Sequence, residues 1–72
     1  MEIHRAAREH GIDDADIRQS ADGFLVADPI GDDAPARELR LGVDTRGRLL
    51  ETVVLLLDNG SELVLHAWLK SA

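Results

Sequence analysis

The sequence predicts an α+β fold in which two N-terminal helices pack on a mostly antiparallel four-stranded sheet. Apolar residues recur with helical spacing over residues 2–21, and later apolar segments have the length and composition of strands. Short glycine-containing turn sequences separate the later segments. A chain of 72 residues is the size of one small domain, so we assign residues 1–72 to a single domain.

Sequence signals for both helices lie in the N-terminal part of the chain. Residues 2–9 follow helical spacing, and Gly11 is suited to end this first helix. Asp13 is a favourable N-cap for a second helix, which we expect to run to about Ala21. Acidic residues in its first turn favour the positive end of the helix dipole.

Four strands are expected after the helices. Residues 24–27 form a short strand, and the loop 28–36 contains both prolines. Residues 37–43 alternate between apolar and polar or small side chains, residues 48–57 are nearly all apolar, and residues 62–69 form the last strand. The continuous apolar segment is typical of a central strand.

Turn length decides which side chains share a face of the sheet. A two-residue turn at Asn59-Gly60 would place Glu51 opposite Trp68. In the preceding hairpin, a four-residue loop pairs Arg40 with Glu51, whereas a three-residue loop with a bulge pairs Leu41 with Glu51. We favour the first register because it gathers apolar side chains on the face toward the helices. That face would contain Thr52 as its only polar member, beside Leu39, Leu41, Val43, Leu50, Val54, Leu56, Leu63, Leu65, Ala67 and Leu69.

The opposite face would then contain Arg40, Glu51 and His66 beside apolar side chains. An arginine next to an acid–base pair can cleave RNA without a metal ion. Glu51 would accept the proton of a ribose 2′-hydroxyl, His66 would protonate the 5′-oxygen, and Arg40 would stabilise the phosphate. The alternative is an ordinary cross-strand pair between Arg40 and Glu51, with His66 as a surface residue.

The same face carries apolar residues that we expect another chain to cover, because they form a large patch for a monomer. The candidate partner-binding residues are Val53, Leu55, Val64 and Trp68. A second copy of the chain or a different protein would satisfy this expectation.

Composition restricts the function classes. The formal net charge of −6 argues against a broad nucleic-acid-binding surface, which needs lysine and arginine. The sequence has no cysteine and no apolar segment of the roughly 18 residues that a membrane span needs. We expect a cytoplasmic protein without a cofactor, and no metal site, because His4 and His10 do not share a helix face.

Four segments resemble a known family, at residues 8–12 (REHGI), 39–42 (LRLG), 47–54 (GRLLETVV) and 62–67 (ELVLHA). The chain resembles the BrnT-like proteins of the RelE/ParE toxin superfamily, the toxin halves of bacterial type II toxin–antitoxin modules. The resemblance implies a RelE/ParE-like fold, an endoribonuclease activity with RNA as substrate, and an antitoxin as protein partner. It also implies that Glu51, Arg40 and His66 act at the site.

Two functional hypotheses follow. The first is a ribonuclease-type toxin that uses Glu51, His66 and Arg40. The second is a non-catalytic interaction module, either a degenerate toxin or a homodimerising domain, which binds a protein over its sheet face.

Overall fold

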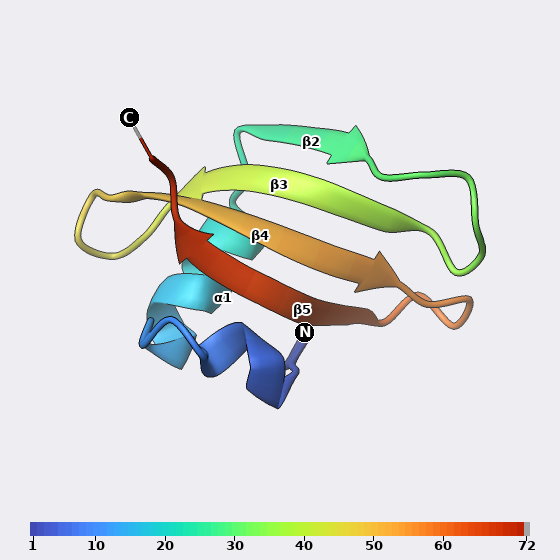
Figure 1. Cartoon of the computed structure of the whole chain (residues 1–72), viewed down its shortest axis with the longest axis horizontal. Coiled ribbons are helices and arrows are strands. Elements are labelled where there is room, and N and C mark those ends of the chain that lie inside the picture. Colours follow the sequence, from blue (N-terminus) through green and yellow to red (C-terminus); the bar gives the residue numbers. More distant parts are fainter. Residues whose placement is uncertain (72) are drawn as a thin grey trace.

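The computed structural model describes residues 1–71, in which a five-stranded mixed sheet has the strand order β1-β5-β4-β3-β2 (Figure 1). The elements are β1 (Glu2–Ile3), the 3-10 helix η1 (Arg5–Arg8), α1 (Asp14–Asp22), β2 (Val26–Pro29), β3 (Arg37–Val43), β4 (Leu49–Leu56) and β5 (Glu62–Leu69). β1 pairs in parallel with β5, and the other neighbours pair antiparallel.

The expected fold class is wrong, because the described residues contain one α-helix and five strands rather than two helices and four strands. The difference lies in residues 2–9. Glu2 and Ile3 extend along β5, and a 3-10 turn follows, capped by the amide of Ala6 donating to His4 Nδ1 over 3.0 Å. So short a segment gains little as an isolated helix, whereas strand pairing satisfies backbone groups at the β5 edge.

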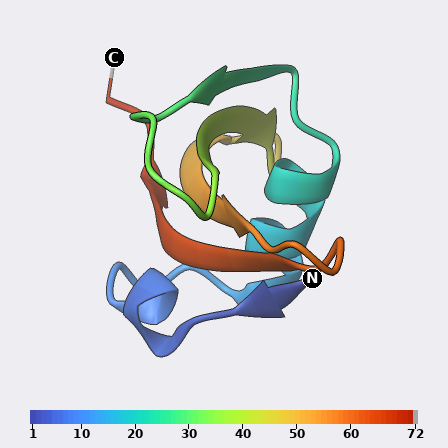
Figure 2. The same cartoon turned by 90° about the vertical axis from the view of Figure 1, so that its right-hand side faces the viewer.

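The second expected helix is confirmed as α1, with Asp13 at the N-cap and Gly23 at the C-cap. The Asp13 carboxylate contacts Arg46 at 3.0 Å instead of a backbone amide. Ile12 and Ile17 are both buried where α1 begins. α1 contacts β3 and β4, and Figure 2 shows it on one side of the twisted sheet.

The predicted bounds of β3 and β5 are confirmed, but the predicted register between β3 and β4 is wrong. This hairpin closes over a three-residue loop, because the amide of Asp44 donates to the carbonyl oxygen of Arg48 over 2.9 Å. Gly47 ends the loop with a φ of 79°, a left-handed conformation that glycine adopts without strain. Leu41 therefore lies opposite Glu51, the pairing that we considered but did not favour.

The second hairpin also closes over three residues, since the amide of Leu57 donates to the carbonyl oxygen of Ser61 over 3.0 Å. Gly60 has a φ of 87° and ends this loop. A bulge in β5 then shifts the register back between Val53 and Val54 of β4. The predicted pairing of Glu51 with Trp68 is confirmed beyond the bulge, whereas pairs nearer the turn are displaced by one residue.

The core lies between the sheet and the helical segments. It consists of Ile3, Ala7, Ile12, Ile17, Ala21, Leu50, Val54, Val64 and Ala67. The face of β4 toward α1 contains Leu50, Thr52 and Val54, as expected. Across residues 1–71, no helix has both the length and the apolar composition needed to cross a membrane.

Candidate protein-binding face

Arg40 lies on the opposite side of the sheet from Glu51 and His66, so the expectation of one shared face is wrong. Directly opposite residues of antiparallel strands point to the same side. Arg40 lies opposite Thr52, which is buried toward α1. Glu51 comes directly before Thr52 along β4 and therefore points to the other side, as does His66, which lies opposite Val53.

The buried Arg40 side chain, 5% exposed, donates hydrogen bonds from all three of its guanidinium nitrogens. Its Nε donates to Glu38 over 2.9 Å, and its Nη2 donates to Glu62 over 2.7 Å. Its Nη1 donates to the carbonyl oxygen of Ala21 near the C-terminal end of α1, and the guanidinium stacks 4.7 Å from the ring centroid of Phe24. These contacts fasten α1, β3 and β5 together.

The pairing of Arg40 with two glutamates raises its pKa by more than burial lowers it. Burial alone would lower the pKa of Arg40, but hydrogen bonds from its guanidinium to Glu62 and Glu38 raise the pKa above its usual value. The hydrogen bond from Arg40 lowers the pKa of Glu62. Arg40 is thus a permanently charged structural group that is committed to its own chain.

A single glycine explains why β3 presents a charged residue to the helix. A Cβ atom on Gly42 would lie 2.0 Å from the carbonyl oxygen of Ser20, so α1 crosses β3 directly over this position. Because Gly42 must face the helix, Arg40 and Glu38, two and four residues before it, face the helix as well. A glycine inside a strand is the sequence signal for such a close approach, and it could have fixed the register.

The side of the sheet away from α1 is the candidate site, and we name it the open face. Its side chains form three rows across the strands, each row following the observed pairing. The rows are Val26–Leu41–Glu51–Trp68, Asp28–Leu39–Val53–His66 and Ile30–Arg37–Leu55–Leu63. None of these residues belongs to the buried core cluster. Most are apolar, and all are half-buried or exposed.

The two candidate acid–base residues remain neighbours on the open face. Glu51 lies opposite Trp68, and His66 lies opposite Val53, so Glu51 and His66 are diagonal across the β4–β5 pair. The Trp68 indole donates from Nε1 to Glu51 Oε1 over 3.0 Å. His66 is exposed. No enclosed pocket forms among residues 1–71, so the pair lies on an open surface.

Three of the four expected partner-binding residues lie on the open face, namely Val53, Leu55 and Trp68. Val64 does not, because the β5 bulge turns it into the core, where it is completely buried. Leu39, Leu41 and Leu63 also lie on the open face, although the predicted register placed them on the helix side. The corrected face is therefore more apolar than the predicted one.

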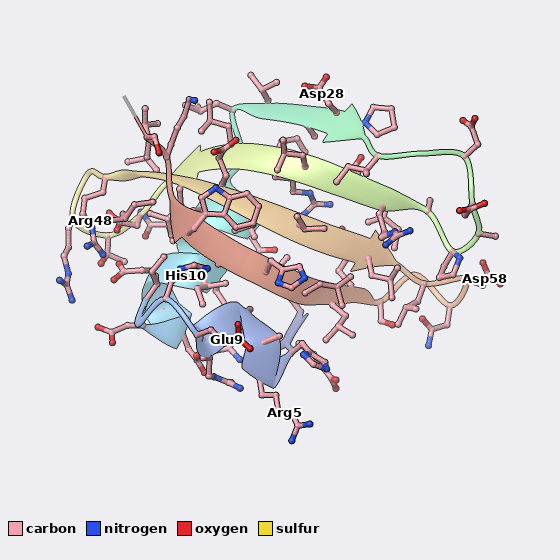
Figure 3. The ribbon with its side chains drawn as sticks, viewed as in Figure 1. Arg5, Glu9, His10, Asp28, Arg48 and Asp58 are labelled. Carbon is pink, nitrogen blue, oxygen red and sulfur yellow. The ribbon has the colours of Figure 1, made fainter. Side chains whose placement is uncertain are left out.

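The open face reaches the free edge of the sheet at β2. Val26 is 50% exposed, and Ile30 just after the strand is 37% exposed. Between them, Asp28 lies on this outermost strand (Figure 3). Asp28 is the only acidic residue in the middle row, and His66 stands at the opposite end of the same row.

A separate polar network holds the β3–β4 loop at one end of the sheet, where Arg48 is shown in Figure 3. Burial opposes ionisation of Asp44, but hydrogen bonds from the backbone and side chain of Arg48 and from the Arg46 amide lower its pKa. Asp16 of α1 accepts hydrogen bonds from the Thr45 amide and hydroxyl. This network is structural, and within residues 1–71 no three potential metal-ligating side chains gather at one point.

Comparison with models of known protein families, with curated proteins and with solved structures finds no match.

Proposed function

We propose that this protein is a small protein-binding module that acts through its open face. The observation that carries the proposal is the one-sided cover of the sheet. α1 contacts β3 and β4 from the other side, and the large apolar side chains of the open face do not join the core. Surfaces of this kind mark contact sites with other proteins.

The placement of the polar groups is typical of a protein-binding surface rather than of an enclosed active site. Arg40 is held by Glu38 and Glu62 and does not reach the open face. Aromatic and large aliphatic side chains form the central parts of protein interfaces, with charged groups at the rim. On the open face Trp68 provides an aromatic anchor, and Asp28 and His66 stand at the ends of a row with an apolar centre.

Site-specific photocrosslinking tests the proposal. A photoreactive residue placed at Val53 in the expressed full chain should form covalent adducts with a protein, to be identified by mass spectrometry. The matched control is the same residue at Ala15, which is exposed on α1. Protein adducts from position 53 alone support the module, and equal adducts or none from the two positions overturn it.

A second candidate, the metal-independent endoribonuclease, is favoured by one observation: Glu51 and His66 remain neighbours on an accessible face. Glu51 would accept the 2′-hydroxyl proton of RNA, and His66 would protonate the 5′-oxygen leaving group. Arg40 would have no direct role at such a site.

Growth after induction in a bacterial host tests this second candidate. Wild type should arrest growth, while Glu51→Ala and His66→Ala should relieve the arrest. Glu9→Ala and His10→Ala are matched controls, because both residues lie at the exposed end of η1 in Figure 3. Growth that is unaffected by well-expressed wild type contradicts the ribonuclease.

A further inference from the structure

We propose that the partner of the open face is a second copy of this chain, packed sheet against sheet about a two-fold axis that runs along the strands between β3 and β4. This inference rests on the proposed function and names its partner. It is drawn from the order of side chains in the three rows, from the two edges of the sheet, and from the size of the face.

The middle row is self-complementary. It reads Asp28, Leu39, Val53 and His66 from β2 to β5. A two-fold axis between β3 and β4 places β2 over β5 of the second copy and β3 over its β4. Each Asp28 then meets His66 of the partner subunit, and each Leu39 meets Val53 of the partner subunit. A carboxylate thus meets an imidazole at both ends of the row, around an apolar centre.

The outer rows bring apolar side chains together at their ends under the same axis, while their inner charged members, Arg37 and Glu51, face leucines of the second copy. Val26 meets Trp68 of the partner subunit, and Ile30 meets Leu63 of the partner subunit, so apolar side chains meet at both edges. Glu51 is the charged member of the Trp68 row, and its Oε1 already accepts a hydrogen bond from the Trp68 indole over 3.0 Å. Its carboxylate therefore enters the contact with one oxygen satisfied from its own chain.

The edges of the sheet are poorly suited to association. β1 offers only two residues at one edge, and β2 offers four residues at the other, the last of which is Pro29. Proline has no backbone N–H to donate to an added strand, and short edge strands give few pairing groups. Association through the face leaves these edges unused and follows the aligned packing of two-sheet sandwiches.

The face has the size of a modest interface. β3, β4 and β5 have seven or eight residues and β2 has four, so the four strands give a flat footprint of about 430 Å², from the usual rise and strand spacing. Side chains make the accessible area larger than this footprint. Specific interfaces at the small end of the range bury about 600 Å² on each partner. We therefore expect a dimer that dissociates on dilution.

Sedimentation equilibrium across a concentration series tests the dimer. Wild type should form a dimer, and Asp28→Lys should weaken it by about tenfold or more, because a cation then faces His66 of the partner subunit. Asp58→Lys is the matched control, since Asp58 is exposed in the β4–β5 loop, far from Asp28 in Figure 3. Circular dichroism checks that each variant is folded.

A charge exchange identifies the arrangement. The double variant Asp28→His with His66→Asp restores the contact in reverse and should return the dimer to within about threefold of wild type. Each single change should weaken it. Single changes without effect, or a double variant as weak as the single ones, overturn the two-fold arrangement.

The result also separates this inference from the proposed function. A wild-type chain that stays monomeric overturns the dimer. If photocrosslinking at position 53 then still yields adducts with a different protein, the binding module stands without self-association. If it yields none, both proposals fail.

Discussion

Gly42 of β3 lies directly beneath Ser20 of α1, so closely that a Cβ atom at Gly42 would stand 2.0 Å from the Ser20 carbonyl oxygen. The neighbouring atom belongs to the backbone, so it cannot move aside as a flexible side chain would. This contact fixes which face of β3 meets the helix. It therefore fixes the sides on which Arg40 and Leu41 emerge.

Gly42→Ala should reduce the free energy of unfolding by about 2–3 kcal/mol, because α1 must shift away from the sheet to admit a methyl group. Urea unfolding followed by circular dichroism measures the loss. Gly31→Ala is the control, because Gly31 has a positive φ but open space around its Cβ position, so only a backbone cost of about 1 kcal/mol is expected. Equal losses in the two variants would contradict a steric role for Gly42.

Arg40→Met should destabilise the fold by about 2–3 kcal/mol, since it leaves Glu38 and Glu62 without their cation while both remain partly buried. Adding Glu38→Gln and Glu62→Gln to this variant should recover much of the loss. Thermal unfolding of the single and triple variants provides the measurement. Arg5→Met, at an exposed arginine of η1, should change little. A triple variant no more stable than the single one would show that charge pairing is not the cause.

Stability should fall with acid because three carboxylates, those of Asp14, Asp44 and Glu62, have pKa values below their ordinary range, and the last two belong to partly buried networks. The pKa of Asp44 and that of Glu62 are both lowered in the folded chain. Both carboxylates therefore bind protons more weakly in the folded chain than in the unfolded chain, where carboxyl pKa values are about 4. Their stabilisation is fully present above that pH and is lost as the pH falls through the folded-state pKa values.

Asp44→Asn checks the contribution of the loop carboxylate to this pH dependence. The difference in unfolding free energy between wild type and variant should be largest near neutral pH and should shrink below about pH 4. Asp33→Asn, at an exposed loop residue, serves as the control. A constant difference across the whole pH range would contradict the assignment to Asp44.

Thr52→Val should stabilise the protein by about 1 kcal/mol. Thr52 is 1% exposed, and its Oγ1 has no hydrogen-bond partner among residues 1–71. Valine has nearly the same shape without the buried hydroxyl that must be stripped of water. The measurement is the midpoint of urea unfolding. The slope of the unfolding free energy against urea concentration should not change. A lower midpoint would indicate that the hydroxyl has a partner in solution, such as an ordered water molecule.

Sequence patterns predicted the long strands and α1 because these depend on local signals. Turn residues bounded β3 and β5, and Asp13 marked the start of α1. The segment at Glu2–Ile3 has no such signal, because two residues are too few for a periodic pattern and the strand exists only by pairing with β5. The helix count and the strand count were therefore both wrong.

The strand register decides which residues form the candidate site. It depends on turn geometry that the sequence alone does not specify. A two-residue turn of the expected type needs a positive φ at both Asn59 and Gly60, but within residues 1–71 only glycines have one. The Asn59 side chain instead accepts hydrogen bonds from the Ser61 amide and hydroxyl, which supports the longer loop. Glu51 and His66 still share a face because both lie beyond the β5 bulge.

The contacts of Arg40 carry a consequence for the natural variation of this protein. Glu38 is two residues away in the same strand, Glu62 lies on β5, and Ala21 contributes its carbonyl oxygen from α1. A neutral residue at position 40 becomes acceptable only when the two glutamates change as well. In orthologous sequences, positions 38, 40 and 62 should therefore be substituted together, and chains that retain the arginine should retain a glycine at position 42.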